Sequence, residues 1–346
     1  MEKIKLTHYS HGAGCGCKIP PGILDEILKT GIYTPANDKL IVGNLGKDDA
    51  AVYDIGNEQY LISTTDFFMP VVDDAYDFGR IAAANAISDV YAMGGKPVLA
   101  IAILGWPVNK LPAELAQKVL EGARCICAEA GIPLAGGHSI DSTEPIFGLA
   151  VNGLVNRINL KQNKTAEPGD LIYLTKKLGV GILSTAEKKA ILKEEHTGLA
   201  LGQMVKLNKF GEIAGKFQGV TAMTDVTGFG LLGHLIEMTE GSNLSAVIDY
   251  GLIPLIEELN FYTSQFCFPD NTFRNWNNYE HKVSGITADS LLTLCDPQTN
   301  GGLLITVAPS SKEAFEQLLI NEELQDFIRP IGKMKDRADR RVYIEN

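Results

Sequence analysis

The pattern of apolar and polar positions predicts a mixture of strands and helices with no repeating parallel unit. The longest helical pattern covers residues 80–93, where Asp77 is placed to cap the start and Gly94-Gly95 to end the helix. Further helices are expected at residues 21–29, 112–130, 181–192, 198–217 and from 311 onward. Strands are expected at residues 50–53, 59–65, 97–104, 146–155, 170–175, 303–307 and 341–344, with 97–104 read as a buried strand.

A polar stretch near the middle of the chain predicts a domain boundary. Residues 156–169 lack an apolar period and end in the turn signal Pro168-Gly169. We therefore expect four segments. They are a flexible glycine-rich N-terminal segment at 1–43, a first domain at 44–157, a linker at 158–169 and a second domain at 170–346.

Composition narrows the class of protein. A chain of 346 residues with 45% hydrophobic and 21% charged content is long enough for two domains with real cores. The formal net charge of −11 opposes binding to nucleic acid or anionic membranes, and no apolar run is long enough to cross a bilayer. With no export signal, the six cysteines are expected to be reduced thiols in a cytoplasmic protein.

The first candidate for chemistry is the arm formed by residues 10–18, Ser-His-Gly-Ala-Gly-Cys-Gly-Cys-Lys. Its three glycines allow the backbone to close over a ligand, and Lys18 favours the thiolate form of Cys15. A different hypothesis is a compact metal site made by His8, His11, Cys15 and Cys17.

Several aspartates are candidate metal ligands. Asp89 lies in an apolar helical stretch, where an unpartnered charge is costly to bury, and Mg²⁺ is a suitable partner for a carboxylate. Asp49 follows Asp48 in a polar loop, and Asp225 lies in a strand-to-helix turn that favours an anion. The alternative for Asp89 is an acid exposed at a helix end or bonded to nearby backbone. For Asp48 and Asp49 it is a solvated loop, and Thr224 or Asp225 is alternatively a helix N-cap.

Two further segments are candidates for nucleotide contacts. Asp66 ends the predicted strand at 59–65, and an acid at a strand end often faces a ligand. The turn-like Gly136-Gly137-His138-Ser139 presents bare backbone and a hydroxyl, which suits contact with ribose or phosphate. His138 is equally compatible with a purely structural role.

Taken together, these motifs resemble those of the selenophosphate synthases in their cysteine-containing bacterial form, over nearly the whole chain. The matching segments are residues 11–18, 48–52, 63–68, 85–89, 136–139 and 223–230. The resemblance implies that ATP, selenide and water are converted to selenophosphate, AMP and orthophosphate with Mg²⁺. The product would supply activated selenium for selenocysteine and selenium-modified tRNA.

The resemblance also implies roles for individual residues. Cys15 falls on the catalytic cysteine position and Lys18 on the position of an essential lysine that contacts phosphate. The metal-ligand positions are Asp49, Asp89 and Asp225. The ATP-contacting positions are Lys18, Gly46, Lys47, Asp48, Asp66, Asp89, Gly137, His138 and Ser139.

The implied fold is two α+β domains of the aminoimidazole ribonucleotide synthetase type, with the first-domain sheets of two subunits pairing into a barrel across a homodimer. A selenium-delivery protein is a further conceivable partner. The chain departs from the family at Asn300, where serine is usual, and at Pro269-Asp270-Asn271-Thr272, where Pro-Gly-Gly-Thr is common.

Two rival functions remain open at this point. An ATP-dependent ligase or dehydratase of the same superfamily would phosphorylate an oxygen of its substrate and release ADP, without an obvious need for a mobile cysteine. A non-catalytic carrier of metal or selenium would use His8, His11, Cys15 and Cys17, and would leave the internal aspartates unexplained.

Overall fold

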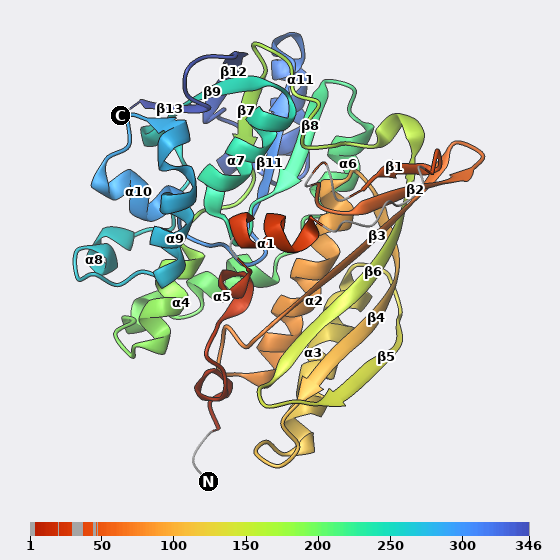
Figure 1. Ribbon diagram of the computed structural model, residues 1–346, viewed down its shortest axis with the longest axis vertical. Helices are drawn as coiled ribbons and strands as arrows, with labels where there is room; N and C mark the ends of the chain where they lie inside the picture. Colours follow the sequence, from red (N-terminus) through yellow and green to blue (C-terminus); the bar gives the residue numbers. More distant parts are fainter. Residues whose placement is uncertain (1–3, 20, 30–36, 44–45, 47, 346) are drawn as a thin grey trace.

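Two β-sheets with helices packed on them form the molecule (Figure 1). The computed structural model describes residues 4–19, 21–29, 37–43, 46 and 48–345. The first sheet has the strand order β1-β2-β3-β6-β4-β5, and the second has the order β10-β13-β9-β12-β7-β11-β8. No helix in the described part of the chain is both long and apolar enough to span a membrane.

The first sheet is antiparallel except at its β4–β5 edge, where the two strands run parallel. Its strands are β1 (Leu40–Val42), β2 (Ala51–Gly56), β3 (Gln59–Phe68), β4 (Lys96–Trp106), β5 (Leu134–Asp141) and β6 (Ile146–Asn156). Apolar residues alternate along the long central strands, so one face of the sheet is buried and the other lies outside. The sheet therefore needs helices on one side only.

Helices α2 (Ala75–Ala92) and α3 (Ala113–Glu129) supply that cover and pack closely on each other. Most residues of α2 are buried, because the sheet, α3 and parts of the second half of the chain surround it. The close approach requires glycine, since a Cβ atom at Gly79 would lie 1.9 Å from the carbonyl oxygen of Val119. Asp89 is thus carried on a helix that the fold holds rigidly in its interior.

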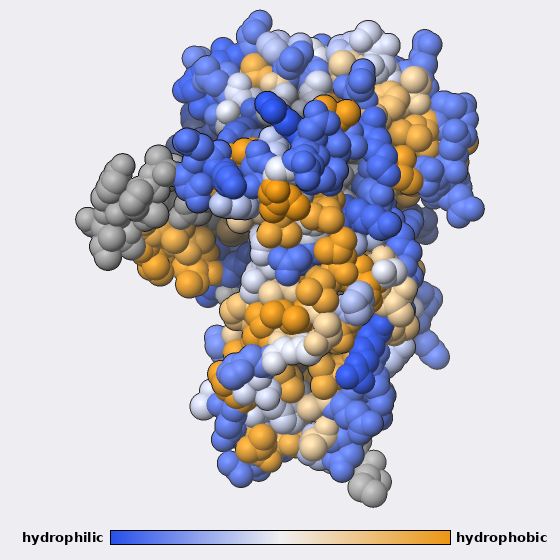
Figure 2. Space-filling view, turned by 90° about the vertical axis from the view of Figure 1, so that its right-hand side faces the viewer, coloured by the Kyte–Doolittle hydropathy of each residue, from blue (hydrophilic) through white to orange (hydrophobic). Residues whose placement is uncertain are grey.

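The outer face of the first sheet carries exposed apolar side chains. Phe67 on β3, Ile101 on β4 and Ile140 on β5 are 51%, 42% and 59% exposed. Figure 2 shows this face, with a hydrophobic area extending across the sheet. The expectation that residues 97–104 are a buried strand is correct for one face only, because helices cover only one side of this sheet.

The second sheet is covered on both faces. One hydrophobic cluster joins it to α7, and another joins it to α6 and α11. Its strands are β7 (Leu171–Leu174), β8 (Val220–Asp225), β9 (Leu244–Asp249), β10 (Val283–Ser284), β11 (Leu303–Val307), β12 (Gly332–Asp336) and β13 (Val342–Glu345). The helices of this half are α4 (Val180–Lys188), α5 (Leu199–Val205), α6 (Phe210–Lys216), α7 (Gly230–Gly241), α8 (Leu259–Thr263), α9 (Asp270–Tyr279), α10 (Ala288–Leu294) and α11 (Lys312–Asn321).

The two halves share a core, and the N-terminal arm lies against both. Side chains from α4, α5 and α8 join the hydrophobic cluster of the first sheet, α2 and α3. A short 3₁₀ helix at Leu6–Tyr9 precedes the arm, a second one at Gly14–Cys17 lies within it, and α1 (Pro21–Leu28) follows. The domain boundary at residues 158–169 stays a prediction.

The α+β class is confirmed, while some element boundaries differ from expectation. The helix expected at 80–93 starts earlier, because Asp74 accepts hydrogen bonds from the backbone N–H groups of Tyr76 and Asp77 and is the actual cap. The single helix expected at 198–217 is two helices, α5 and α6, separated by a break at residues 206–209. Asp66 lies inside β3 instead of at its end.

The contact between α2 and α3 predicts a position that tolerates no side chain. Gly79→Ala should lower the free energy of unfolding by about 1–3 kcal/mol, because the new methyl group collides with the backbone of α3. The matched control is Gly202→Ala in α5, where a Cβ atom meets nothing within 4 Å and alanine favours the helix. Thermal melts of the two variants give the comparison, and equal stabilities would contradict this packing.

Candidate active site

Five aspartates from distant parts of the chain line one cavity of about 340 Å³. Asp49 precedes β2, Asp66 lies in β3, Asp89 in α2, and Asp225 ends β8. Asp48 is the fifth. The cavity therefore forms where the first sheet, its central helix and an edge strand of the second sheet meet. The convergence of Asp49, Asp89 and Asp225, which spacing along the chain could not establish, is a property of this fold.

Each of three aspartates accepts a hydrogen bond from a hydroxyl on another segment. Thr224 Oγ1 donates to Asp49 Oδ1 at 2.7 Å. Thr64 Oγ1 donates to Asp89 Oδ2 at 2.5 Å. Ser88 Oγ donates to Asp225 Oδ2, also at 2.5 Å. These hydrogen bonds hold each carboxylate in place through one of its oxygen atoms. The second oxygen atom of each carboxylate takes no part in these bonds.

The sequence analysis did not assign functions to these hydroxyl groups. Thr64 precedes Asp66 by two residues, and Ser88 is next to Asp89, so both lie inside segments already singled out. Their pairing with particular acids depends on contacts between elements, which no spacing rule reveals. Glu237 of α7, which also lines the cavity, carried no signal at all.

Burial raises the pKa values of the clustered carboxyl groups. For Asp49 and Asp89, burial is the main cause and the neighbouring charge of Asp225 adds to it. Burial also raises the pKa of Asp225, and it raises that of Asp48 to about 6. Such a cluster is unfavourable unless positive charge compensates it. The arrangement thus favours a cationic ligand.

Lys18 is the single lysine or arginine among the described residues that line this cavity. Its Nζ atom donates to Thr227 Oγ1 at 3.4 Å and lies 5.9 Å from the ring centre of Phe229. Burial alone lowers the pKa of this amine, but the nearby negative charges, of which Asp66 has the largest effect and Asp89 and Asp225 add to it, outweigh burial and raise the pKa. Lys18 is therefore a fixed positive charge at the edge of the acid cluster.

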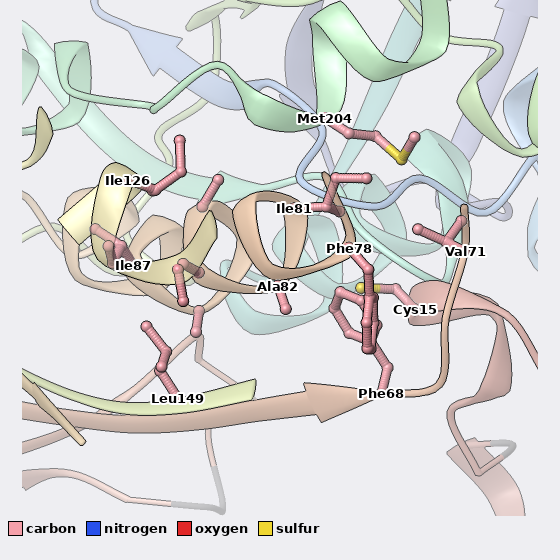
Figure 3. Close-up of a cluster of buried hydrophobic side chains, with 14 of the residues drawn as sticks. Cys15, Phe68, Val71, Phe78, Ile81, Ala82, Ile87, Ile126, Leu149 and Met204 are labelled. Atoms are coloured by element: carbon pink, nitrogen blue, oxygen red, sulfur yellow. The ribbon is translucent and has the colours of Figure 1, made fainter. Parts of the chain in front are cut away.

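Cys15 is buried beside the cavity, with its side chain 1% exposed. Its Sγ atom donates to Asn85 Oδ1 at 3.1 Å, and its backbone N–H donates to Thr299 Oγ1 at 3.2 Å. Figure 3 shows the thiol entering the hydrophobic cluster next to Phe68 and Phe78. In this position the arm is closed against the body of the protein.

Asn85 connects the thiol to the acid cavity. Its Oδ1 atom accepts hydrogen bonds from both Cys15 and the backbone N–H of Asn300, the latter at 2.7 Å, while its Nδ2 atom donates to Asp66. Asn300 has a positive φ of 50°, and its side-chain amide donates to the carbonyl oxygens of Met204 and Lys206. The departure from serine at position 300 thus lies one hydrogen bond from the residue that holds the thiol.

The turn after β8 is in close contact with the backbone of the arm. A Cβ atom at Gly228 would lie 2.4 Å from the carbonyl oxygen of Cys15 and 3.3 Å from Lys18 Cδ. Glycine at this position allows the backbone of the arm to contact the turn directly. The turn of residues 222–230 therefore positions both Asp225 and the two candidate residues of the arm.

The oxygen-rich lining suits a hard divalent cation. Asp48 Oδ2 and Asp49 Oδ2 are buried and have no hydrogen-bond partner among the described residues. Within that same part of the chain, no three His, Cys, Asp or Glu side chains are placed to hold one ion by themselves. Carboxylates that supply only part of a coordination shell are typical where phosphate oxygens and water complete it.

The structure does not bring every predicted residue to this cavity. Gly137, His138 and Ser139 lie in β5, are exposed, and do not line the cavity. The expectation of a turn here is wrong, because the segment pairs with β4 as a parallel edge strand. Gly46 precedes the acid loop, and Lys47 lies outside the described residues.

The alternative metal site of the arm gains no support from the described residues. His11 is paired with Glu144, with 2.9 Å between His11 Nδ1 and Glu144 Oε2, and the Cys15 thiol points instead toward Asn85. Cys125 is exposed and Cys127 buried on α3, as expected for positions two apart on a helix.

Family models place the chain among two-domain proteins related to aminoimidazole ribonucleotide (AIR) synthase. The model for the N-terminal domain of AIR synthase-related proteins matches residues 47–155, and the model for their C-terminal domain matches residues 167–345. The fold and the acid cavity between its two halves thus define an AIR synthase-related protein.

Comparison with curated proteins gives the family within that class. The chain is 59% identical over 334 residues to selenide, water dikinase of Colwellia psychrerythraea, which covers 96% of each protein. It is 56% identical over 343 residues to selenide, water dikinase of Pseudomonas putida, which covers 99% of each. The chain belongs to the selenide, water dikinase family.

Solved structures with much lower identity share the fold. A thiamine-monophosphate kinase from Stenotrophomonas maltophilia matches with a TM-score of 0.66 and 19% identity, over 89% of this chain and 92% of that one. The hydrogenase maturation protein HypE in complex with ATP matches with a TM-score of 0.64 and 17% identity, over 89% and 87%. At these identities the likeness concerns the fold alone.

The buried acid cluster predicts a characteristic dependence of stability on pH. Because the pKa of Asp225 is higher in the folded protein, folding takes up a proton, and stability of the ligand-free protein falls as pH rises above about 4. Asp225→Asn should therefore raise the melting temperature at pH 8 and reduce this slope. The exposed Asp339→Asn serves as control. An Asp225→Asn protein that melts earlier than wild type at pH 8 would contradict the interpretation.

Proposed function

We propose that this protein synthesises selenophosphate from selenide, with ATP as phosphoryl donor and AMP and orthophosphate as further products. The observation that carries the proposal is the convergence of Asp49, Asp89 and Asp225 with Lys18 in one cavity, beside a cysteine-bearing arm. This arrangement provides what a polyphosphate needs, namely hard oxygen ligands for divalent cations and a fixed amine. The membership of the family supports the same reaction.

Mg²⁺ is the proposed metal, and the residues present fit it. Asp49, Asp89 and Asp225 would hold it together with phosphate oxygens, and it would neutralise the charge that develops on the transferred phosphoryl group. The buried, unpartnered Oδ2 atom of Asp49 supports this assignment. The buried like charges also explain why a ligand with bound cations would be favoured.

The residues of the arm would act on the nucleotide tail. Lys18, kept protonated by the surrounding acids, would bind a phosphate oxygen. Hydrogen selenide would then attack the γ-phosphorus, so that a selenium–phosphorus bond forms and the bond from that phosphorus to the bridging oxygen breaks, leaving ADP. The closed arm would exclude water during this step, which protects the labile product.

A second displacement would consume the retained ADP. Water would attack the β-phosphorus, the bond to the oxygen bridging to the α-phosphorus would break, and AMP and orthophosphate would be released, with the water protons passing to phosphate and solvent. We propose Cys15 as the catalytic thiol. Its hydrogen bond to Asn85, which also contacts Asp66, supports a role linked to the state of the acid cavity.

We further propose a homodimer in which the outer faces of the first sheets pair, as the family barrel would require. The exposed apolar residues Phe67, Ile101 and Ile140 support this arrangement, because such a face is costly to leave in water. Gly137, His138 and Ser139 lie on the same exposed edge, so the nucleotide contacts proposed for them would be made in the paired assembly. Cys125, Cys127, Cys267 and Cys295 form no disulfide, which supports the proposed cytoplasmic location.

The products of the reaction test the proposed function directly. Incubation with ATP, Mg²⁺ and anaerobic selenide should give selenophosphate, AMP and orthophosphate in equal amounts by phosphorus NMR. Cys15→Ala should lower selenide-dependent turnover by about 100-fold or more, because the thiol is part of the chemistry. The exposed Cys125→Ala is the matched control and should keep wild-type turnover. ADP as the final product would indicate a ligase or dehydratase instead, and unchanged ATP a carrier.

The proposed dimer predicts the effect of a charge on the outer face of the sheet. Ile101→Glu should convert the dimer to a monomer, because a carboxylate would have to be buried without a partner in the paired faces. Val108→Glu, at an exposed apolar residue outside the strand, should leave the dimer intact. Sedimentation equilibrium measures both variants, and a monomeric wild type would refute this arrangement.

A further inference from the structure

A second cavity, of about 400 Å³, lies beside the arm and shares no lining residue with the acid cavity. We call it the arm-side cavity. Its walls come from the arm, helices α4 and α9 and the loop before β11. The lining residues used below are Gly16, Ser184, Lys188, Lys189, Arg274 and Thr299.

The arm-side cavity reaches to within one residue of Cys15. Gly16 lines it directly, and Thr299, another lining residue, accepts the hydrogen bond from the Cys15 backbone N–H at 3.2 Å. The cavity therefore borders the closed arm at the position of the catalytic thiol. Nothing in the proposed mechanism uses this space.

A narrow hollow of about 10 Å³ lies between the two cavities. It shares Lys18 and Phe229 with the acid cavity, and Asn271 and Arg274 with the arm-side cavity. The Asn271 side chain also approaches the arm, since its Nδ2 atom is 3.7 Å from where a Cβ atom of Gly16 would lie. Asn271 belongs to the segment in which this chain departs from the family pattern.

The two cavities have opposite charge. Lys188, Lys189 and Arg274 line the arm-side cavity, where Asp270 is the exposed carboxylate among the described lining residues. The described lining of the acid cavity has five aspartates, Glu237 and one lysine. A small anion that approaches from solvent is therefore attracted to the arm-side cavity. The acid cavity repels the same anion until cations and nucleotide have filled the acid cavity.

The wall of the arm-side cavity also offers an unused polar group. Ser184 Oγ on α4 is buried and has no hydrogen-bond partner among the described residues. A buried hydroxyl without a partner is unfavourable, and an anion in the cavity would accept a hydrogen bond from it. Lys188, Lys189 and this hydroxyl would thus bind the same class of ligand, namely a small anion.

We propose that the arm-side cavity binds the hydrogen selenide anion and is the route by which it reaches Cys15. The proposal rests on the proposed function, because it names the path of one of its substrates. Hydrogen selenide is a small monoanion at neutral pH, which matches the charge of this cavity. Selenide and the nucleotide would then arrive from different sides of the arm, so one does not block the other.

Reversing the charges of Lys188 and Lys189 tests the proposal by steady-state kinetics. In Lys188→Glu/Lys189→Glu, the KM for selenide should rise about fivefold or more, while the KM for ATP changes less than twofold. Higher salt should raise the KM for selenide in the wild type and have a smaller effect in the variant. Lys333→Glu, an exposed lysine on β12 away from this cavity, makes a matched change of charge and should leave both constants unaltered.

A second measurement does not depend on turnover. The Cys15 thiol is alkylated with the anion iodoacetate and with neutral iodoacetamide, and the two rates are compared by peptide mass spectrometry. The ratio of anionic to neutral rate should fall about fivefold in the double variant and stay unchanged in Lys333→Glu. Arg274→Glu should lower the ratio as well.

The outcomes separate this proposal from the proposed function. The arm-side route alone is overturned if the wild type makes selenophosphate and AMP while the double variant keeps both its KM for selenide and its alkylation ratio unchanged. A wild type that makes neither product would refute the proposed function, and the alkylation ratio would still decide whether anions reach Cys15 through this cavity.

Discussion

The gathering of five carboxyl groups in one cavity is the constraint on which the rest of this structure depends. Burial raises the pKa values of Asp48, Asp49, Asp89 and Asp225, and the repulsion between the acids works against folding in the absence of a cation. Hydroxyl donors from Thr64, Ser88 and Thr224 hold three of the acids without neutralising them. The acid cavity thus lowers the stability of the ligand-free protein and favours ligand binding, as is common where function requires like charges to lie close together.

The fold keeps these charges together by building the cavity from both of its halves. Helix α2 carries Asp89 and is packed on the first sheet and α3, while helices from the second half cover its remaining sides. Strand β8 brings Asp225 to the same place, and the following turn admits the arm at Gly228. Because Asp66, Asp89 and Asp225 belong to packed strands and a packed helix, these three acids cannot relieve their repulsion by moving apart.

The arm provides the link between this charged site and the thiol. Lys18 reaches the acids, Cys15 is held by Asn85, and Asn85 in turn contacts Asp66. A change in the charge of the acid cavity can therefore act on the arm through the side chains of Lys18 and Asn85. The arm also separates two cavities of opposite charge, so that an anion and a cation-bound nucleotide are each favoured on a different side.

Sequence alone determined the α+β class, the glycine-rich arm and the identity of the acids, because glycine, cysteine and isolated aspartates in apolar stretches have few structural uses. It placed the cap of α2 at Asp77 and a turn at Gly136–Ser139, since neither the competing Asp74 nor the pairing with β4 is visible in local patterns. Which hydroxyl binds which acid, the contact of Asn300 with Asn85 and the charge of each cavity depend on residues distant in the chain. Only tertiary structure decides such contacts, because they follow from the packing of whole elements.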